Sequence, residues 1–286
     1  MAKVKAKREV EVVILSDIHL GTYGCHATEL VAYLKSVSPK LLILNGDVID
    51  GWAFSKRYFP NSHMAVLSEF FKIMKKETQI IYITGNHDEF LRKYTDLSMG
   101  NLFLTDKYLL EIEGKKHWIF HGDVFDNTTS GGAKFIAKLG GIGYDWLILV
   151  NRAINWVLEK FGKGKVSLSK KVKNSVKEAV KFIGDFEKKA AEIAIDNHYD
   201  YVICGHIHQP ADKIWTTEKG SVHYLNSGDW IENLSWLEYN KGTWSLKFFN
   251  EKDFEKPEIE ANDISVNMEE LIHPKVFANF VGDKFN

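Results

Sequence analysis

The sequence predicts an α/β protein that folds as a four-layer α/β/β/α sandwich with an inserted helical segment. Strand and helix patterns first alternate as β-α-β-α-β, and a second group of strand patterns follows. A long stretch between the strands of that second group has helical periodicity only. The alternation indicates a largely parallel sheet covered by helices, and the later strands supply a second sheet.

The alternating unit is defined by short apolar, β-branched runs that a polar cluster stops, separated by segments with helical spacing. Pro39 is expected to end the first helical pattern. Ligands of parallel sheets collect at the carboxyl ends of the strands, so the polar clusters there are the first candidates for a site. The expected elements are strands at 9–17, 41–47 and 79–88 and helices at 28–37 and 64–76.

The second strand group opens with alternating runs over 108–123, where Gly114 marks the turn of a hairpin. Further strands are expected at 199–206, 221–229 and 236–249. The helical patterns between them read as an insertion. We therefore expect a domain over residues 1–250 with a helical lid inserted at about 124–198, followed by a C-terminal arm at 251–286 that has no assigned role.

Charge, cysteine content and the lengths of the apolar runs bear on partners and compartment. The 286 residues have a net charge of −1, so nothing suggests a nucleic-acid partner. Two distant cysteines, Cys25 and Cys204, predict a reducing compartment without disulfides. The N-terminal stretch lacks the apolar core of a signal peptide, and no apolar run reaches about 18 residues. We expect a cytoplasmic protein, with peripheral contact with a membrane left open.

Residues that ligate metals stand at the end of each expected strand. "SDIHLG", "NGDVID" and "GNHDEF" follow the first three strands, and "HGDVFD" and "CGHIHQP" come later. Each fragment alone is typical of a surface turn. Independent turns, however, have no reason to place carboxylates and imidazoles at successive strand ends of one sheet. Together they predict a metal site with seven candidate ligands: Asp17, His19, Asp47, Asn86, His121, His206 and His208.

The ligand chemistry indicates which ions fit. Oxygen and nitrogen donors without cysteine suit Mn²⁺, with Fe²⁺ or Zn²⁺ as alternatives. Seven ligands are too many for one catalytic ion, so we expect two ions that share a carboxylate, about 3.5–4 Å apart. Such a pair activates water for hydrolysis of a phosphate ester. Glycines beside the ligands permit sharp turns and close approach of the backbone: Gly46, Gly85, Gly122 and Gly205.

The five blocks, in this order over residues 10–210, resemble the calcineurin-like metallophosphoesterases. The resemblance implies that Asp17, His19, Asp47 and His208 hold one ion and that Asp47, Asn86, His121 and His206 hold the other, with Asp47 as the bridge. It also implies that His87 stabilises the transition state or protonates the leaving oxygen, and that Asp88 orients it. The alternative for His87 is a core histidine bound by backbone groups.

The inserted segment bears on the substrate. Residues 143–162 are apolar on nearly every face, and 167–195 are amphipathic with a lysine stripe beside the apolar one. This pattern suits a lid over acyl chains and a second phosphate, or else a helical hairpin that merely packs on the domain. The candidate substrate contacts are Ser169, Lys173, Asn174 and Lys177.

Within the superfamily, "SDIHL", "GDVIDGW" and Phe90 are most similar to the UDP-2,3-diacylglucosamine diphosphatases of lipid A biosynthesis. That resemblance implies cleavage of a pyrophosphate bond to give UMP and a lipid 1-phosphate, at the cytoplasmic face of the inner membrane. One departure is His87, which stands where the better-known members have arginine. Two alternatives stay open: a soluble phosphodiesterase or phosphoprotein phosphatase with the same metal core, and a non-catalytic scaffold. Asp229 is either an outer contact of the site or, as we prefer, part of a turn.

Overall fold

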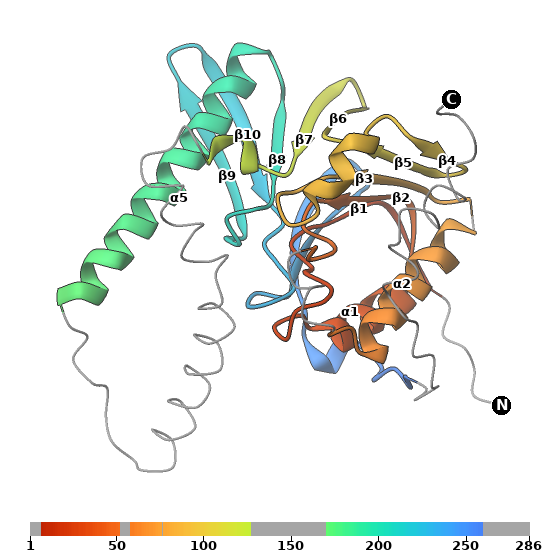
Figure 1. The fold of residues 1–286 in the computed structure, drawn as a ribbon. Coiled ribbons are helices and arrows are strands. Elements are labelled where there is room, and N and C mark those ends of the chain that lie inside the picture. Colours follow the sequence, from red (N-terminus) through yellow and green to blue (C-terminus); the bar gives the residue numbers. More distant parts are fainter. Residues whose placement is uncertain (1–6, 52–57, 76, 127–169, 260–286) are drawn as a thin grey trace.

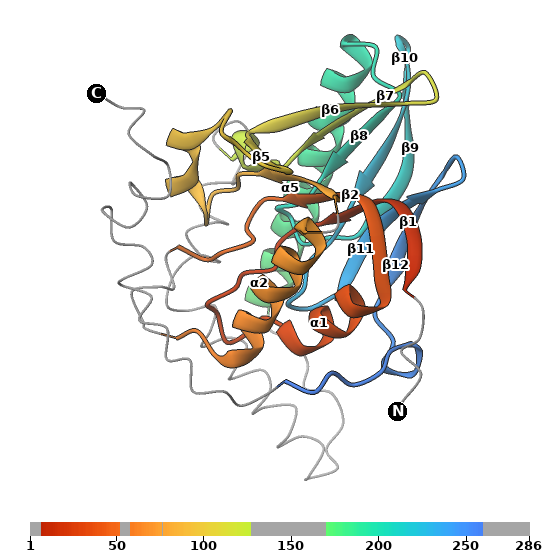
Figure 2. The same cartoon turned by 90° about the vertical axis from the view of Figure 1, so that its right-hand side faces the viewer.

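The computed structural model describes residues 7–51, 58–75, 77–126 and 170–259, and of residues 170–179 it describes the helical backbone only. Within these ranges the chain forms two β-sheets packed face to face, with helices on both outer faces (Figures 1 and 2). The expected α/β/β/α sandwich is confirmed.

The first sheet has seven strands in the order β12-β11-β1-β2-β3-β5-β4. Its centre is parallel: β1 pairs with β2, β2 with β3 and β3 with β5, while β11 adds to β1 in the antiparallel sense. The carboxyl ends of the parallel strands therefore meet at one edge. The strands are β1 (Arg8–Leu15), β2 (Val37–Asn45), β3 (Gln79–Ile83), β4 (Ser98–Met99), β5 (Leu102–Thr105), β11 (Ser235–Asn240) and β12 (Thr243–Phe248).

The second sheet has five strands in the order β6-β7-β8-β10-β9. Its central strands β7, β8 and β10 are parallel, and β6 and β9 flank them in the antiparallel sense. The hairpin turn at Gly114, with a φ of 74°, lies where the sequence predicts it. The strands are β6 (Lys107–Ile112), β7 (Lys115–Phe120), β8 (Tyr201–Cys204), β9 (Ala211–Thr217) and β10 (Gly220–Asn226).

Three hydrophobic clusters separate the four layers. Val13 and Leu15 of β1 belong to the cluster shared with helices α1 (Ala27–Ser36) and α2 (Asn61–Met74). Val12 and Ile14 of the same strand belong to the cluster between the sheets. This division follows because successive side chains of a strand point to opposite faces. On the far side, helix α5 (Lys170–Asp196) covers the second sheet with a cluster that contains the fully buried Phe186.

Several boundaries differ from the predictions. β2 begins at Val37 and contains Pro39, which we expected only to end the preceding helix. Pro39 is tolerated because β3 pairs with β2 only from Leu41 onward, so at Pro39 the strand has a sheet partner on one side. The expected strand 236–249 is the hairpin of β11 and β12, turned at Lys241 and Gly242 with φ values of 50° and 80°.

Three strands and three 3-10 helices were not predicted. β4, β5 and β9 are such strands, and the 3-10 helices are η2 (Glu89–Tyr94), η3 (Asp123–Phe125) and η4 (Glu251–Asp253). Of the inserted segment, the helical pattern at 167–195 corresponds to α5, whereas the apolar stretch at 143–162 lies outside the described residues. The arm begins with η4, after which Phe254 stacks on Phe249.

Two further findings concern the expected compartment and membrane contact. Cys25 and Cys204 are both free thiols, and Cys204 is buried. None of the described helices is both long enough and apolar enough to pass through a bilayer.

Candidate metal centre

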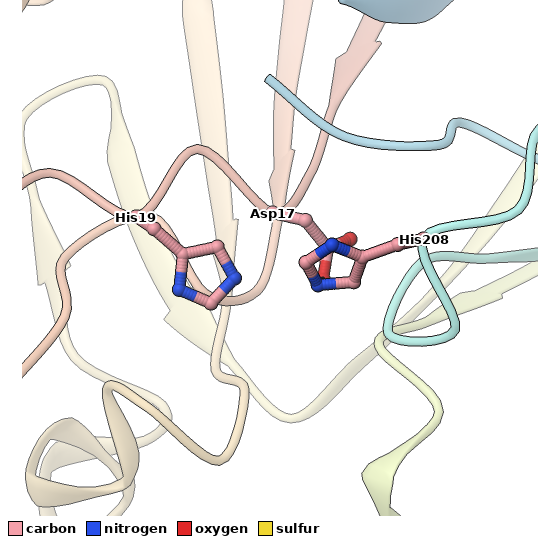
Figure 3. Close-up of side chains that lie close together, drawn as sticks. All are labelled: Asp17, His19 and His208. Carbon is pink, nitrogen blue, oxygen red and sulfur yellow. The ribbon is translucent and has the colours of Figure 1, made fainter. Parts of the chain in front are cut away.

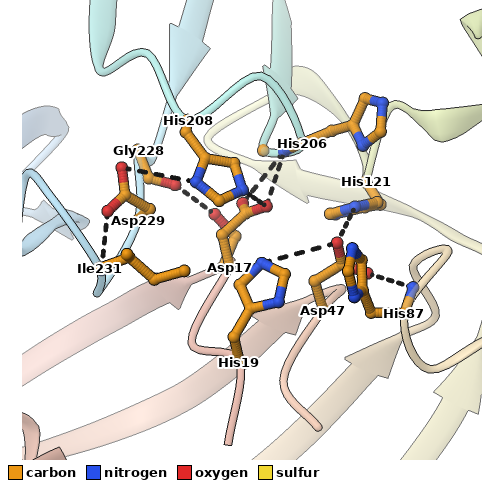
Figure 4. Close-up of polar contacts among 12 residues, drawn as sticks. Asp17, His19, Asp47, His87, His121, His206, His208, Gly228, Asp229 and Ile231 are labelled. Atoms are coloured by element: carbon orange, nitrogen blue, oxygen red, sulfur yellow. Dashed lines mark hydrogen bonds and ion pairs between the residues drawn. The ribbon is translucent and has the colours of Figure 1, made fainter. Parts of the chain in front are cut away.

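The seven candidate ligands lie in loops at the carboxyl ends of five strands. Asp17 and His19 follow β1, Asp47 follows β2 and Asn86 follows β3, all in the first sheet. The second sheet contributes the rest: His121 follows β7, and His206 and His208 follow β8. Both sheets therefore supply ligands to the same place, where their edges meet (Figure 4).

The backbone at these positions has an unusual conformation. Five of the seven residues have φ values between 51° and 68°, which is uncommon for residues with a side chain. Hydrogen bonds between neighbouring loops hold the conformation: Asp17 N–H donates to Gly46 O at 3.1 Å and His19 N–H to Asp47 O at 2.9 Å. The left-handed turns direct the side chains inward over the strand ends. The five residues are Asp17, His19, Asp47, His206 and His208.

A first ligand group consists of Asp17, His19 and His208, whose ligand atoms lie within 4.8 Å of one another (Figure 3). His208 Nε2 is 3.2 Å from Asp17 Oδ1. Burial would raise the pKa of Asp17, but the neighbouring His208 lowers it to about 2. Burial would likewise lower the pKa of His208, but Asp17 raises it to about 9. Asp17 is thus held as a carboxylate that faces two imidazoles.

A second ligand group consists of Asp47, His121 and His206, again with ligand atoms within 4.8 Å. Asp47 Oδ2 lies 3.3 Å from His121 Nε2 and 3.8 Å from His19 Nε2. One carboxylate oxygen therefore faces imidazoles of both groups. This is the geometry expected of a shared ligand between two ions.

The donor atoms fit divalent cations. His19 Nε2, Asn86 Oδ1 and His121 Nε2 are buried and have no hydrogen-bond partner among the described residues. Leaving such an atom unsatisfied costs about 1–3 kcal/mol. A cation bound between the carboxylates would satisfy all three, and oxygen and nitrogen donors without sulfur are the set that such ions take.

Close approach of the loops depends on glycine. A Cβ on Gly46 would lie 2.3 Å from His121 Nδ1, and one on Gly85 would lie 2.2 Å from Asp47 Oδ1. A Cβ on Gly205 would lie 2.6 Å from Asp17 Oδ2. No real Cβ makes contacts this short, so each ligand occupies space that only a glycine leaves open. The expected role of these glycines is confirmed.

Each histidine ligand also contacts an oxygen behind it. His121 Nδ1 lies 2.9 Å from Asn45 O, and His208 Nδ1 lies 3.9 Å from Asp229 Oδ2. The contact of His121 is a hydrogen bond, which fixes the orientation and tautomer of the imidazole, whereas the 3.9 Å separation at His208 is a charge contact only.

The outer contact of His208 bears on the two roles considered for Asp229. Asp229 also accepts backbone hydrogen bonds from Ile231 and Glu232, at 2.7 and 2.5 Å. It therefore both closes a turn and contacts the site, so our preference for the turn alone was too narrow.

His87 lies at the edge of the centre. Its backbone N–H donates to Asp47 Oδ1 at 2.8 Å, and its ring packs edge-on against His19 with centroids 4.6 Å apart. The carboxylate beside its Nδ1 is Asp50 Oδ2, at 3.0 Å, which is also 3.5 Å from His19 Nδ1. Asp50 is not among the predicted site residues, although it is the last residue of the block "NGDVID", three residues after Asp47.

Asp88 differs from the expectation that it orients His87. Its carboxylate is fully buried and accepts hydrogen bonds from Val48 N, Tyr82 Oη and Gly85 N, at 3.0, 2.7 and 2.5 Å. Burial and the nearby Asp47 raise the pKa of Asp88 to about 6. Asp88 therefore ties the Asn86–His87 loop to the Asp47 loop rather than holding the His87 ring.

The candidate substrate contacts are not described by the structure. Ser169 lies outside the described residues, and Lys173, Asn174 and Lys177 belong to the part of α5 of which only the backbone is described. These four assignments stay predictions.

Comparison with protein families places the geometry in context. The family model described as calcineurin-like phosphoesterase matches residues 10–210, the span that holds all seven candidate ligands. Divalent-metal phosphoester hydrolysis is therefore the activity of this chain's family, in agreement with the two ligand groups.

Three individual proteins illustrate the range of similarity. A UDP-2,3-diacylglucosamine hydrolase from Aliivibrio fischeri is 23% identical over 239 residues, which cover 82% of this chain and 97% of that protein. A DNA polymerase II small subunit from Thermoplasma acidophilum is 27% identical over 263 residues, covering 81% of this chain and 47% of that protein. A solved phosphoesterase from E. coli aligns with a TM-score of 0.39 at 14% identity, covering 84% of this chain and 99% of that one.

Proposed function

This chain belongs to the calcineurin-like phosphoesterase family, and from that premise we propose that it hydrolyses UDP-2,3-diacylglucosamine, or a close nucleotide-linked lipid, to UMP and the lipid 1-phosphate. It is a metal-dependent phosphoesterase. The observation that carries the proposal is the pair of ligand groups with Asp47 between them. Three buried donor atoms at this place have no hydrogen-bond partner within the described part of the chain.

The proposed site binds two divalent ions. Mn²⁺ is the preferred candidate, and Fe²⁺ and Zn²⁺ are the alternatives. One ion would be held by Asp17, His19, Asp47 and His208, and the other by Asp47, Asn86, His121 and His206. When bound, such a pair supplies activated water near neutral pH and stabilises negative charge on a phosphate. The chain's part is to keep the donors close together before any ion arrives, which the glycine contacts and left-handed turns do.

His87 is the proposed acid or transition-state stabiliser. It is 17% exposed at its side chain, lies against His19, and has Asp50 at its Nδ1. Burial alone would lower the pKa of His87, but the hydrogen bond with Asp50 and the charge of Asp47 raise it. A histidine kept protonated in this way can donate a proton to the oxygen that leaves phosphorus.

Two observations support a nucleotide-linked lipid as the substrate. The relatives named UDP-2,3-diacylglucosamine hydrolase match over most of this chain and nearly all of their own length. In addition, α5 packs on the second sheet through Phe182, Phe186 and Ala190, and its first turns extend beyond that sheet (Figure 1). Those turns carry Lys173 and Lys177 in the sequence, and the proposal gives these two lysines the role of binding a phosphate of the substrate at the inner-membrane surface.

The test is release of UMP from UDP-2,3-diacylglucosamine. With Mn²⁺ present, chromatography should show UMP and the lipid 1-phosphate in equal amounts, and a chelator should abolish both. Asp47→Ala is the inactive reference, and Asp212→Ala, on the exposed face of β9, is the matched control. Absence of UMP with Mn²⁺, Fe²⁺, Zn²⁺ and Mg²⁺ alike would contradict the proposal.

A second candidate is a soluble phosphodiesterase or phosphoprotein phosphatase. The feature in its favour is His87 with its partner Asp50, at the position where the lipid hydrolases resembled here have arginine. The same two ligand groups would serve this chemistry. Faster hydrolysis of an aryl phosphodiester or a phosphopeptide than of the UDP-lipid would support it.

A further inference from the structure

Asp126 is an acidic residue that contacts one ligand imidazole of the second group. Its Oδ1 lies 2.7 Å from His206 Nε2, and the side chains are only 18% and 6% exposed. Asp126 closes the block "HGDVFD", five residues after the ligand His121. Neither the resemblance nor the family match gives it a role.

The contact decides which nitrogen of His206 can bind a cation. An ionised carboxylate only accepts hydrogen bonds, so the proton between the two groups belongs to Nε2 of His206. A neutral imidazole with its proton on Nε2 has its lone pair on Nδ1. Nδ1 is then the donor that His206 offers beside Asp47 and His121.

His208 has the opposite arrangement. Its Nε2 lies 3.2 Å from Asp17 Oδ1, and its Nδ1 faces Asp229 Oδ2 at 3.9 Å. Figure 4 shows the His208 ring over Asp17, whereas the His206 ring has a nitrogen on the side of His121. Two histidines separated by one residue thus present different nitrogens, because their carboxylate partners lie behind different ring atoms.

Contacts of the backbone and of the neighbouring residue hold the chain at Asp126 in place. Its backbone N–H donates to Asp123 O at 3.0 Å, at the end of η3. The preceding Phe125 is buried and packs edge-on against Phe186 of α5, with centroids 5.5 Å apart. Phe186 in turn lies 6.2 Å from the His206 ring. Little conformational freedom therefore has to be lost when Asp126 contacts His206, which suits a residue that holds the His206 ring in one orientation.

We infer that Asp126 is a positioning residue that selects Nδ1 of His206 as the ligand atom and strengthens it as a donor. The ion held with Asp47, Asn86 and His121 therefore depends on Asp126, while the ion of the Asp17 group does not. This inference rests on the two-ion site of the proposed function but not on its substrate.

The test compares Asp126→Ala with Asp126→Asn by calorimetric titration of the metal-free full-length chain with Mn²⁺. Losing an outer-shell partner typically weakens metal binding by roughly 10- to 100-fold. We expect that loss for one of the two ions in Asp126→Ala and an unchanged affinity for the other. Asp126→Asn should lie between Asp126→Ala and the wild type, because its amide oxygen still accepts from Nε2–H.

The matched control is Asp212→Ala. Asp212 Oδ1 also contacts a histidine Nε2, that of His223, but on the exposed surface away from the ligands. It removes the same kind of pair and should leave both ions at wild-type affinity. Circular dichroism of all variants checks that the fold is retained.

A second measurement reads the tautomer directly. In ¹⁵N-labelled, Zn²⁺-loaded protein, long-range NMR correlations should show His206 protonated at Nε2 and His208 protonated at Nδ1. His206 protonated at Nδ1, equal weakening of both ions in Asp126→Ala, or no weakening at all would overturn this inference alone. A wild-type chain that binds fewer than two ions would overturn the two-ion proposal with it.

Discussion

Replacing Gly85 by alanine should remove the metal centre while leaving most of the fold intact. The new Cβ would lie 2.2 Å from Asp47 Oδ1 and 2.6 Å from Asp47 N, whereas ordinary contact begins at 3.4 Å. The Asp47 loop must therefore move by about 1 Å. Metal–ligand distances tolerate only about 0.2 Å, so a carboxylate displaced this far no longer serves either ion.

The size of the effect follows from the same contacts. Overpacking of this kind costs about 1–3 kcal/mol of stability, and displacement of Asp47 also lengthens the 2.8 Å hydrogen bond from His87 N–H. This cost leaves a folded majority in a domain of ordinary stability. We expect Mn²⁺ affinity to fall by at least about 100-fold for both ions, because Asp47 lies between both ligand groups and its loss exceeds that of an outer-shell partner.

The assay is the number of Mn²⁺ ions retained per chain, measured by plasma mass spectrometry after dialysis, together with urea unfolding. Gly184→Ala is the control, because a Cβ at Gly184 meets nothing within 4 Å and alanine favours the helix by about 1 kcal/mol. It should bind two ions and unfold at higher urea. Two tightly held ions in Gly85→Ala would refute the reasoning.

Three further predictions concern stability. Adding Mn²⁺ at 100 times its dissociation constant should stabilise the chain by about 2.7 kcal/mol per ion, visible as a rise in melting temperature that Asp47→Ala abolishes. Burial lowers the pKa of His63 to about 4, and its Nδ1 accepts a hydrogen bond from Gly21 N at 2.9 Å. The unfolded chain therefore binds the proton first, and stability should fall between about pH 6.5 and 4 by up to about 3 kcal/mol, a fall that His63→Gln removes in equilibrium denaturation. Burial would raise the pKa of Glu238, but its hydrogen bonds with Arg8, Trp236 and Tyr33 lower it. In urea titrations, Glu238→Gln should therefore be less stable than the wild type at pH 7 by about 1–3 kcal/mol. Below about pH 4.5 the variant should lose less stability than the wild type, because it has no carboxylate to protonate.

The clustering of the seven candidate ligands could be predicted from the sequence, because each of them follows a strand whose apolar pattern is unambiguous. Val12 and Ile14 show the alternation that sets β1, and Asp17 must then lie just past its end. The two-residue strand β4 (Ser98–Met99) is too short to show an apolar pattern, and it is a strand only because it pairs with β5. The β11–β12 turn does have a sequence signal, since Lys241-Gly242 separates two strand-like runs within the single strand expected at 236–249.

The outer contacts of the site could not be predicted in the same way. Asp126 and His206 are 80 residues apart, and nothing in the sequence around Asp126 indicates that it contacts His206. Asp50 and Asp88 both lie in ligand blocks, and sequence proximity pointed to Asp88 for His87. The backbone instead turns Asp88 inward, onto Tyr82 and two backbone N–H groups. Only the relative orientation of the loops distinguishes the two carboxylates.

The division of ligands between the two sheets has a consequence for how the protein survives in a cell. Asp17 and Asp47 come from one sheet and His121 and His208 from the other, so an ion bound by them would join the two sheets at the edge where their strands end. A chain made during metal starvation would lack this connection between the sheets. It would unfold locally more often, and proteases would cleave the unfolded form. Its abundance should then track the supply of divalent metal, with no dedicated regulator required.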